Sequence, residues 1–391
     1  MRVLIDYRPA LRERSGAGEY THELVKALLA AYPPEGGAGG LALTLFSSSF
    51  KDRFTPGPEL VGASPVDRRI PVRLLNFSWH RLGWPPAETL AGRAFDVTHS
   101  SHPLLLPARA AAQVITIHDL NFLSHPERTR AEVRRDYPAL AHAHAIRADA
   151  ILTPSEATAG EIVRVLGVPR ERIAVCPPGA PGWTPRAQAP AKDGYVLFFS
   201  TLEPRKNVGG LLDAYERLLD GAHAAPLEGT RDRQASVPDL VLAGRATGDA
   251  RPWLDRIERA PLKGRVRHVG YVARADRQAL YEGARLLVQP SFDEGFGIPV
   301  LEAMSLGVPV VAANRGSLPE VLGDAGVLVD PDHPEDIANG VARILQDDVF
   351  AARCTAIGRA RARTFSWEQT ARRVFDTYRQ AIARRAGRTG R

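Results

Sequence analysis

The segment Ser291-Phe-Asp-Glu-Gly-Phe-Gly-Ile-Pro-Val-Leu-Glu-Ala-Met-Ser-Leu-Gly-Val-Pro-Val-Val311 places two glutamates eight positions apart around a glycine-rich turn. The apolar run Ala284–Val288 predicts a buried strand before this turn, and Pro299 fits the start of a helix after it. Glu294 is therefore expected in the loop between strand and helix, and Glu302 in the first turn of the helix. Small residues and free N–H groups at a helix start favour binding of anions and hydroxyl groups.

Each glutamate has a plain alternative interpretation. Glu294 alone fits a solvated loop acid, and Glu302 alone fits a residue that favours the helix dipole. Combined with Gly295-Phe-Gly297 and a following strand at 308–312, the two carboxylates instead indicate a nucleotide-sugar pocket. A loop glutamate can accept hydrogen bonds from sugar hydroxyls, and a helix glutamate can bind a ribose diol.

This pattern closely resembles the E-x7-E motif of retaining GT-B glycosyltransferases, specifically glycosyltransferase family 4. The resemblance spans nearly the whole chain, from the loop at Gly16 to the C-terminal helix. It implies an α/β GT-B fold, in which two Rossmann-like domains face each other across a cleft. From the motifs and the resemblance together, the expected donor-binding residues are Gly16, Ala17, Gly244, Tyr271, Val272, Gly295, Phe296, Gly297, Leu301 and Glu302.

The length of 391 residues exceeds the size at which one hydrophobic core stops growing, so two domains are expected. We expect an acceptor-binding domain over residues 1–182 and a linker over 183–194, which is rich in Pro, Ala and Gly. A nucleotide-sugar-binding domain is expected over 195–366. A C-terminal helix over 367–391 is expected to cross back to the first domain, as the resemblance implies.

Apolar runs alternate with helical patterns, which is typical of parallel α/β layers. The long helix of the first half is expected at 127–147, and the segment 221–239 is expected to be a surface insertion. The expected strands are 3–6, 41–46, 96–99, 113–118, 150–153 and 173–176 in the first half, and 195–199, 240–243, 266–269, 286–288 and 308–311 in the second.

Composition indicates a soluble globular protein, with 44% hydrophobic and 24% charged residues. Cys176 and Cys354 form neither a disulfide framework nor a metal-ligand cluster, so a reducing compartment is expected. The N-terminal residues lack an apolar segment of signal-peptide length, and no apolar run reaches the ~18 residues of a membrane span. Cytoplasmic localisation is the simplest expectation.

The net charge of +7 suggests anionic partners. A basic stripe at Arg128–Arg135, where Arg130 and Arg134 share a helical face, fits either a solvated surface or docking on anionic lipid at the inner membrane face. The aromatic run Asn76–Trp84 fits either membrane contact or core packing. Nucleic acid is not an expected partner, since no reading motif or interleaved aromatic residues accompany the charge.

Two further loops in the first half follow expected strands. Gly16, between the first strand and its helix, can bring backbone N–H groups to a phosphate, although taken alone a flexible turn is the better explanation of so short a glycine pair. The resemblance implies that this loop faces the donor diphosphate, and the contact at Ala17 is the less secure since no adjacent Gly-Gly pair is present. His118 and Asp119 end the strand at 113–118. In the resemblance His118 contacts the transferred sugar, and Asp119 is a secondary candidate for the acceptor.

In the second half, Arg205-Lys206-Asn207 comes directly before an expected helix. A cation at the positive end of a helix lowers the stability of that helix by ~0.3–1 kcal/mol. A bound anion therefore explains the two cations better than a plain helix start does. Asn207 can cap the helix. The three residues match the diphosphate clamp of the family. Gly244 with Arg245, and Gly270 with Tyr271 and Val272, fit either a nucleobase pocket or ordinary turns.

The expected reaction is metal-independent hexosyl transfer with retention and without a cofactor. Arg205 and Lys206 would stabilise the leaving diphosphate, Glu294 would hold sugar hydroxyls, and His118 would contact the donor sugar. The resemblance implies that the acceptor hydroxyl enters on the face that the leaving group vacates. His118, Arg205, Lys206 and Glu294 are the expected catalytic residues. Closure of the two domains about the linker would bring them together.

The donor is the least determined feature. Ile115–Leu123 and Ser155–Thr158 look most like the mannosyltransferase branch, which uses GDP-mannose to build surface polysaccharide such as lipopolysaccharide on a glycan or lipid-linked acceptor. UDP-glucose or UDP-N-acetylglucosamine remains an alternative donor. A storage-sugar phosphorylase or synthase and a non-catalytic GT-B subunit are the other classes considered. Hydride transfer is disfavoured, since no G-x-G-x-x-G follows the first strand.

Overall fold

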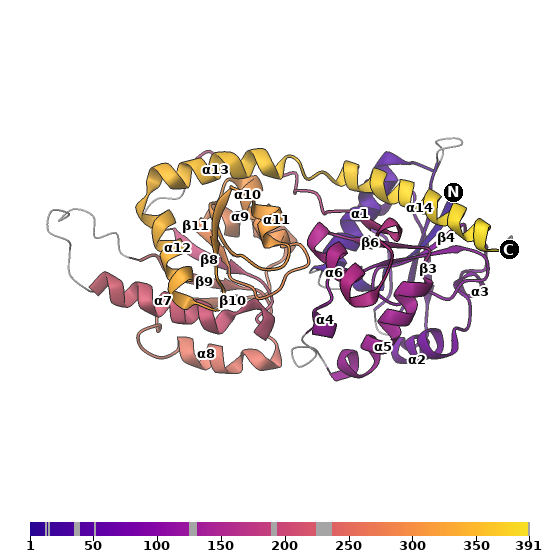
Figure 1. Cartoon of the computed structure of the whole chain (residues 1–391), viewed down its shortest axis with the longest axis horizontal. Helices are drawn as coiled ribbons and strands as arrows, with labels where there is room; N and C mark the ends of the chain where they lie inside the picture. The colour runs from indigo at the N-terminus through magenta and orange to yellow at the C-terminus, as the bar shows by residue number, and fades with distance from the viewer. Residues whose placement is uncertain are drawn as a thin grey trace. The chain divides into compact units, whose positions relative to one another are not determined.

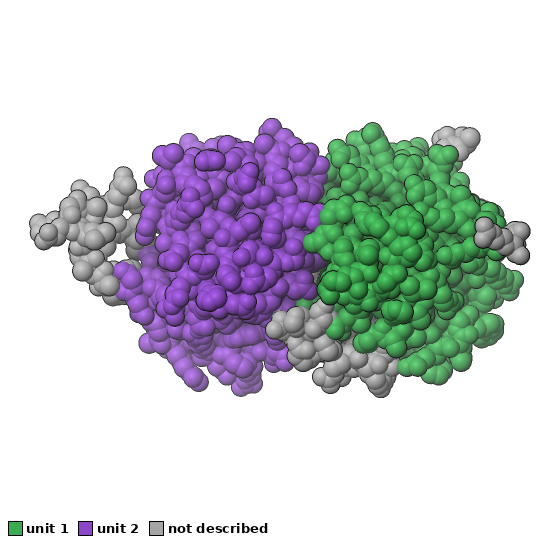
Figure 2. All heavy atoms as spheres, viewed as in Figure 1, with its two compact units in different colours: residues 1–179, 366–391 green, residues 180–365 purple. Residues whose placement is uncertain are grey.

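The computed structural model describes residues 1–11, 14, 16–34, 40–50, 52–124, 131–188, 194–223 and 237–389. They form two compact units (Figure 1, Figure 2). Unit 1 comprises Met1–Gly179 and Ser366–Arg391, and unit 2 comprises Ala180–Phe365. Each unit has a parallel sheet with helices on both faces, which confirms the predicted α/β class with two Rossmann-like domains.

The sheet of unit 1 has seven parallel strands in the order β3-β2-β1-β4-β5-β6-β7. The six strands predicted for the first half are all present, within one or two residues of their expected ends. The edge strand β3 was not expected, because its sequence Ser64-Pro-Val-Asp-Arg68 is mostly polar and contains a proline. The strands are β1 (Arg2–Asp6), β2 (Ala42–Ser48), β3 (Ser64–Arg68), β4 (Val97–Ser100), β5 (Ala112–Thr116), β6 (Ala150–Thr153) and β7 (Ile173–Val175).

The helices of unit 1 cover both faces of its sheet. The first face carries α1 and α14, which pack side by side (Figure 1). The other face carries α5 and α6 over β5 and β6, and α2, η4 and α3 over β1 and β2. The helices are η1 (Arg8–Ala10), α1 (Ala17–Ala31), η3 (Pro58–Leu60), α2 (Val72–Phe77), η4 (Ser78–Leu82), α3 (Ala87–Ala91), α4 (Asn121–Ser124), α5 (Ala131–Arg147), α6 (Glu156–Leu166), η6 (Arg170–Arg172) and α14 (Trp367–Thr389).

Unit 2 has six parallel strands in the order β10-β9-β8-β11-β12-β13. The five predicted strands are present, and β13 was not expected. Helices α7, α8 and α12 pack on one face, and α9, α10 and α11 on the other. The strands are β8 (Tyr195–Phe199), β9 (Leu240–Ala243), β10 (Val266–Gly270), β11 (Ala284–Gln289), β12 (Val310–Ala313) and β13 (Gly326–Val329). The helices are η7 (Pro204–Lys206), α7 (Val208–His223), η8 (Gly248–Ala250), α8 (Arg251–Ile257), α9 (Arg274–Glu282), α10 (Ile298–Leu306), α11 (Leu318–Leu322), α12 (Pro334–Gln346) and α13 (Asp348–Ala362).

Some expectations fall outside the described residues. These are the start of the helix expected at 127–147, the side chains of Arg130 and Arg134, and most of the segment 221–239. The expected linker lies partly outside as well, but its described part packs on unit 2. Trp183 contacts the α10 face, and Arg186 donates to the carbonyl of Ala284 over 2.6 Å. Within the described residues, no helix combines the length and apolar character needed to cross a membrane.

Helix α14 is held to unit 1 by a buried apolar stripe. Ala371, Val374 and Tyr378 are completely buried against α1 and the sheet. The hydroxyl of Tyr378 lies 2.7 Å from Nδ1 of His99, whose other ring nitrogen lies 2.8 Å from the Thr116 hydroxyl. The C-terminal helix is therefore part of the core of unit 1.

Tyr378→Ala is expected to lower the free energy of unfolding by about 3–5 kcal/mol, because it leaves a cavity and removes the hydrogen-bond partner of His99. Denaturant titration followed by circular dichroism measures this loss. The exposed neighbour Arg379 is the control, and Arg379→Ala is expected to change stability by less than about 0.5 kcal/mol. A comparable effect of the two substitutions would contradict this account of α14.

Candidate functional site

Three of the predicted site residues of unit 2 meet where its strand order reverses, whereas Gly244 follows β9 and Tyr271 and Val272 follow β10. From β8 the chain continues to β9 on one side, whereas β11 is followed by β12 on the other. Ligands of open parallel sheets bind at the carboxyl ends of the strands at such a reversal. The loops that follow β8 and β11 carry Arg205, Lys206 and Glu294, which the structure brings together.

The loop after β8 presents two cations in the short helix η7. The side chain of Lys206 is buried, and its Nζ lies 2.6 Å from Oε1 of Glu294. Arg205 lies across the same loop, with Nη1 at 3.8 Å from Oε2 of Glu294 and 3.3 Å from the carbonyl of Asp293. Its Nε donates to Oε1 of Glu203 over 2.6 Å.

These contacts revise the argument made from the sequence. From the sequence, a bound anion was the better explanation of two cations before a helix. Glu203 and Glu294 supply two carboxylates, so the site already contains balancing charges. Asn207 fulfils its predicted capping role, since its Oδ1 accepts from the backbone N–H of Gly210 over 3.2 Å.

Glu294 is the most connected residue of the site. Its Oε1 accepts hydrogen bonds of 2.9 Å from the amide of Gln289 and from the hydroxyl of Ser291. Burial alone would raise the pKa of this carboxyl, but Lys206 and Arg205 outweigh burial and lower the pKa to about 2. The Glu294 carboxyl is therefore ionised at neutral pH. Gln289 and Ser291 were not among the predicted site residues, although both lie within five positions of Glu294.

Glu302 lies one position further into α10 than expected, because the helix starts one residue before Pro299. The helix begins at Ile298, so Glu302 is in its second turn and no acidic residue occupies the first. Its carboxylate is buried against α9, where the hydroxyl of Tyr281 donates to Oε2 over 2.7 Å and Nη1 of Arg277 lies 3.6 Å from Oε1. Sequence reasoning missed both partners. Arg277 and Tyr281 are four positions apart on one helix face, and this spacing was the sequence feature that could have indicated them.

Different structural constraints favour glycine at the predicted glycine positions. Gly297 caps α10 at φ 92°, and a Cβ there would lie 2.6 Å from a methyl group of Leu318. Gly244 has φ 135°, and a Cβ there would lie 1.9 Å from the carbonyl oxygen of Ser200. Packing between two loops thus explains Gly244 without any ligand. Gly16 has φ 50° with open space where a Cβ would lie, so only its backbone conformation restricts it.

The other predicted donor residues of unit 2 differ in exposure. Leu301 is 1% exposed and Phe296 is 5% exposed, and both side chains belong to the core between α10 and the sheet. Tyr271 is 39% exposed and follows the end of β10, with Val272 next to it and partly buried. Gly295 lies between Glu294 and Phe296 in the loop before α10.

In unit 1, His118 lies beside the first turn of α1, which begins at Ala17 after Gly16. The rings of His118 and Tyr20 meet edge to face at 5.2 Å. Burial lowers the pKa of His118 to about 4, with Asp119 and a hydrogen bond to the Ser101 backbone acting in the opposite direction. Nε2 of His118 is buried and has no hydrogen-bond partner among the described residues. The ring is therefore neutral and offers a hydrogen-bond acceptor.

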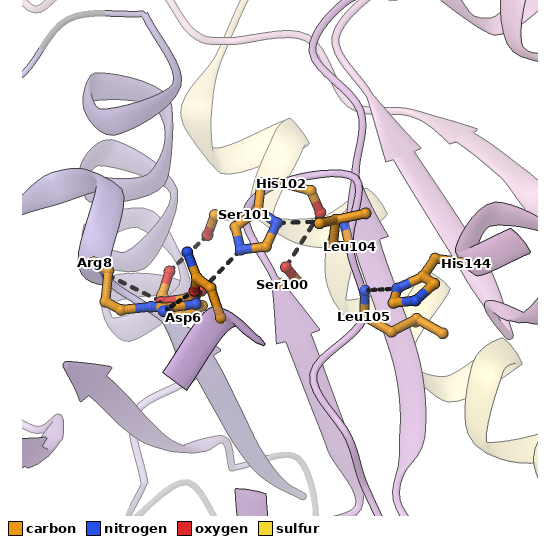
Figure 3. Close-up of polar contacts among 9 residues, drawn as sticks. Asp6, Arg8, Ser100, Ser101, His102, Leu104, Leu105 and His144 are labelled. Carbon is orange, nitrogen blue, oxygen red and sulfur yellow. Dashed lines mark hydrogen bonds and ion pairs between the residues drawn. The ribbon is translucent and has the colours of Figure 1, made fainter. Parts of the chain in front are cut away.

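Unit 1 also contains a polar cluster around Asp6 that was not predicted (Figure 3). Asp6 ends β1 completely buried, and Arg8 binds both of its carboxylate oxygens, at 2.8 and 2.6 Å. Nε2 of His102 lies 3.2 Å from Oδ2 of Asp6, and the Ser101 hydroxyl donates to the Asp6 carbonyl. Burial would raise the pKa of Asp6, but Arg8 and His102 hold it well below its usual range. The rule that selected His118, a polar residue at the carboxyl end of a strand, also selects Asp6.

Nothing in the described part of the chain gathers three or more His, Cys, Asp or Glu side chains in a way that suits a metal ion. Asp330 and Asp332 have the Asp-x-Asp spacing that can bind a divalent cation. Nη2 of Arg315 lies 3.0 Å from Oδ1 of Asp330 and 3.3 Å from Oδ2 of Asp332. Arg315 therefore already balances part of the negative charge of this pair.

Comparison with known proteins identifies both halves of the chain. Residues 183–361 match the family described as glycosyl transferases group 1, and residues 14–181 match the family described as Glycosyltransferase Family 4. O-antigen chain mannosyltransferase B of Escherichia coli is 35% identical, over 97% of this chain and 100% of that protein. The serotype-specific mannosyltransferase WbdA of Escherichia coli is 29% identical, over 74% of this chain and 36% of WbdA. Among solved structures, sucrose-phosphate synthase from Thermosynechococcus elongatus superposes with a TM-score of 0.76 at 21% identity, covering 98% of this chain and 99% of that one.

The buried charge of Glu294 is expected to make stability depend on pH. Its pKa in the folded protein is about 2, below the ordinary 4.5, so its contribution is complete above about pH 4.5 and is lost as pH falls toward 2. Glu294→Gln is expected to lower the free energy of unfolding by about 3 kcal/mol at neutral pH, because Lys206 loses its counter-charge. The gap, which is the difference in free energy of unfolding between the wild type and Glu294→Gln, is expected to shrink as pH falls from about 5 to about 3.

Denaturant titrations at a series of pH values measure this gap. Asp6, whose pKa is also lowered, is common to both proteins and cancels in the difference. The matched control is Glu335→Gln, because the side chain of Glu335 on α12 is 64% exposed. A gap that stays constant with pH would show that the Glu294 charge does not contribute to folding.

Proposed function

The chain belongs to glycosyltransferase family 4, and we propose that it is a retaining mannosyltransferase that uses GDP-mannose and a glycan or lipid-linked acceptor in surface polysaccharide synthesis. The observation that carries the proposal is the buried Lys206–Glu294 pair, with Arg205 beside it, at the strand-order reversal of unit 2. Family membership supports glycosyl transfer, and the two E. coli relatives, which are named as mannosyltransferases, support mannose as the sugar.

Arg205 and Lys206 are assigned to the donor diphosphate. Both precede the first turn of α7, where backbone N–H groups and the helix dipole favour an anion. Glu203 and Glu294 hold the two cations in place, so a diphosphate shares cations that are already oriented. The negative charge on the diphosphate grows as the sugar leaves, and preorganised cations stabilise that charge.

Glu294 is assigned to the hydroxyl groups of the transferred sugar. Ser291, Gln289 and Lys206 all bind its Oε1, so that Oε2 is the oxygen with the greater capacity to accept from the sugar. Its ionised state also suits it to steady positive charge on an oxocarbenium-like sugar. Glu302 is assigned to the ribose, with Tyr281 and Arg277 fixing the position of its carboxylate.

His118 is assigned to a hydroxyl of the donor sugar, because its neutral ring has an acceptor nitrogen without a partner in the described part of the chain. Proton removal from the acceptor is assigned to the departing phosphate, so no side-chain base is required. Gly16 and Ala17, at the start of α1, are assigned to backbone contacts with the donor, and Asp119 to the acceptor. No metal ion enters this proposal, since Arg205 and Lys206 supply the positive charge.

Calorimetric titration with GDP and UDP in the presence of EDTA tests the donor assignment. GDP is expected to bind at least about tenfold more tightly than UDP, which corresponds to ~1.4 kcal/mol of base discrimination. Glu302→Gln is expected to weaken GDP binding about tenfold or more, because the ribose diol loses a charged acceptor. Glu335→Gln is the control and is expected to bind normally.

Tighter binding of UDP would keep the enzyme class and replace mannose with a UDP-linked sugar. Binding that requires a divalent cation would contradict metal-independent transfer. Binding of neither nucleotide would favour a non-catalytic subunit.

Arg205→Ala and Glu294→Gln are each expected to reduce the transfer rate by about 10²–10³-fold, because each removes a charge aimed at the transition state. Transfer of radiolabelled mannose from GDP-mannose to an acceptor measures the rate, and NMR of the product tests retention through its anomeric configuration. The control is Arg217→Ala, since the Arg217 side chain on α7 is 52% exposed and pairs with Glu335. A folded Arg205→Ala protein with wild-type turnover would overturn the assignment of Arg205.

A further inference from the structure

Five large apolar side chains lie exposed in one short segment of unit 1. They come from α2, η4 and the two residues after η4, and together they are called the apolar surface here: Val72 at 42% exposure, Leu74 at 59%, Phe77 at 58%, Leu82 at 64% and Trp84 at 65%. Single exposed apolar residues are ordinary, but large contiguous apolar patches are rare on monomeric soluble proteins and mark interaction sites, so five such side chains within thirteen positions suggest an interaction site.

The expectation for Asn76–Trp84 left membrane contact and core packing open, and the structure divides the run between them. Trp79 is buried, and its ring nitrogen donates to the carbonyl of Pro85 over 2.9 Å. Phe77 and Trp84 are both more than half exposed. The buried Trp79 therefore anchors the segment, and the exposed rings are available to a partner.

A basic cavity adjoins the apolar surface. Its volume is about 670 Å³, within the usual range for a ligand pocket. Leu82 belongs to both the cavity and the apolar surface, and Ile146, which is 39% exposed, lies at the cavity as well. Four arginines line the cavity, and none of the described residues around it is Asp or Glu: Arg81 from η4, Arg147 from the end of α5, and Arg385 and Arg388 from the end of α14.

The arginines are held by backbone and by one buried acid. Arg388 donates to Oδ1 of the buried Asp149 over 3.2 Å, and Arg385 lies 3.5 Å from the carbonyl of Arg109. Three separate parts of the sequence thus contribute positive charge to one cavity. Guanidinium groups favour phosphate, which each can bind with two parallel hydrogen bonds.

We propose that the apolar surface docks on an anionic lipid bilayer and that the cavity receives the phosphate of a lipid headgroup. Aromatic and aliphatic side chains beside arginines suit the boundary between headgroups and acyl chains, where rings insert and basic groups meet lipid phosphate. A soluble anion alone would leave the apolar surface without a partner. Docking is separate from sugar transfer, so it can fail while the proposed function stands.

Flotation with vesicles tests the proposal. The full-length protein is expected to float with vesicles of equal parts phosphatidylcholine and phosphatidylglycerol, to stay behind with pure phosphatidylcholine, and to dissociate as salt screens the charges. Trp84→Ser is expected to weaken partitioning about tenfold through lost apolar burial. Arg81→Glu is expected to weaken it by at least about fivefold, the effect of one basic residue near an anionic surface.

The matched controls are Val349→Ser and Arg251→Glu in unit 2. Val349 is 82% exposed and the Arg251 side chain is 85% exposed, so each control makes the same chemical change on a surface residue outside the cavity. Both controls are expected to partition like the wild type. All four variants change exposed residues, and unchanged melting temperatures would confirm that they fold.

Three results would overturn the proposal. These are equal partitioning to neutral and anionic vesicles, an equal loss in the controls and the test variants, and saturable binding of inorganic phosphate without any flotation. GDP titration of Trp84→Ser separates the two proposals, because nucleotide binding in unit 2 is expected to be unchanged. A variant that binds GDP normally and no longer floats would support docking and leave the transfer assignment intact.

Discussion

The strand order of each sheet reverses once, and this constraint determines where reactive side chains can meet. All strands of a sheet are parallel, so their carboxyl ends share one edge, and at the reversal the loops leave that edge in opposite directions. In unit 2 the reversal lies between β8 and β11, which lets Lys206 reach Glu294 at 2.6 Å across 88 positions of sequence. In unit 1 it lies between β1 and β4, where Asp6 meets Ser101 and His102.

Charge balance is the second constraint on unit 2. A buried carboxylate costs several kcal/mol unless it is paired and hydrogen-bonded, and Glu294 is both. Arg205 and Lys206 precede the positive end of α7, where cations are disfavoured by ~0.3–1 kcal/mol each. Glu203 and Glu294 offset that cost without any ligand. The site is thus a preorganised set of oriented charges, and an incoming anion gains from charges that need no further ordering.

Local sequence was sufficient for every strand except β3 and β13, for the start of α10 and for the proximity of Arg205, Lys206 and Glu294, because apolar runs and turn residues fix which loops follow which strands. Contacts made across elements were not predictable in this way. Glu302 is held by Tyr281 and Arg277 from α9, a helix that the sequence did not indicate. Gly244 was ambiguous between pocket and turn until the carbonyl of Ser200 showed which neighbour excludes a side chain. The positions of His118 and Glu294 follow from topology, whereas their protonation states follow from neighbours that only the folded chain brings near.

The two units differ in the kind of group that they offer at their carboxyl edges. In unit 1 the charge of Asp6 is matched by Arg8 and His102, and His118 is neutral because burial lowers its pKa to about 4. That edge presents hydrogen-bonding groups without a dominant charge, which suits sugar hydroxyls. In unit 2 the corresponding edge presents an arginine and a lysine in fixed positions, which suits a diphosphate. A nucleotide sugar carries both kinds of group, so the chemistry of each unit, considered separately, suits part of such a donor.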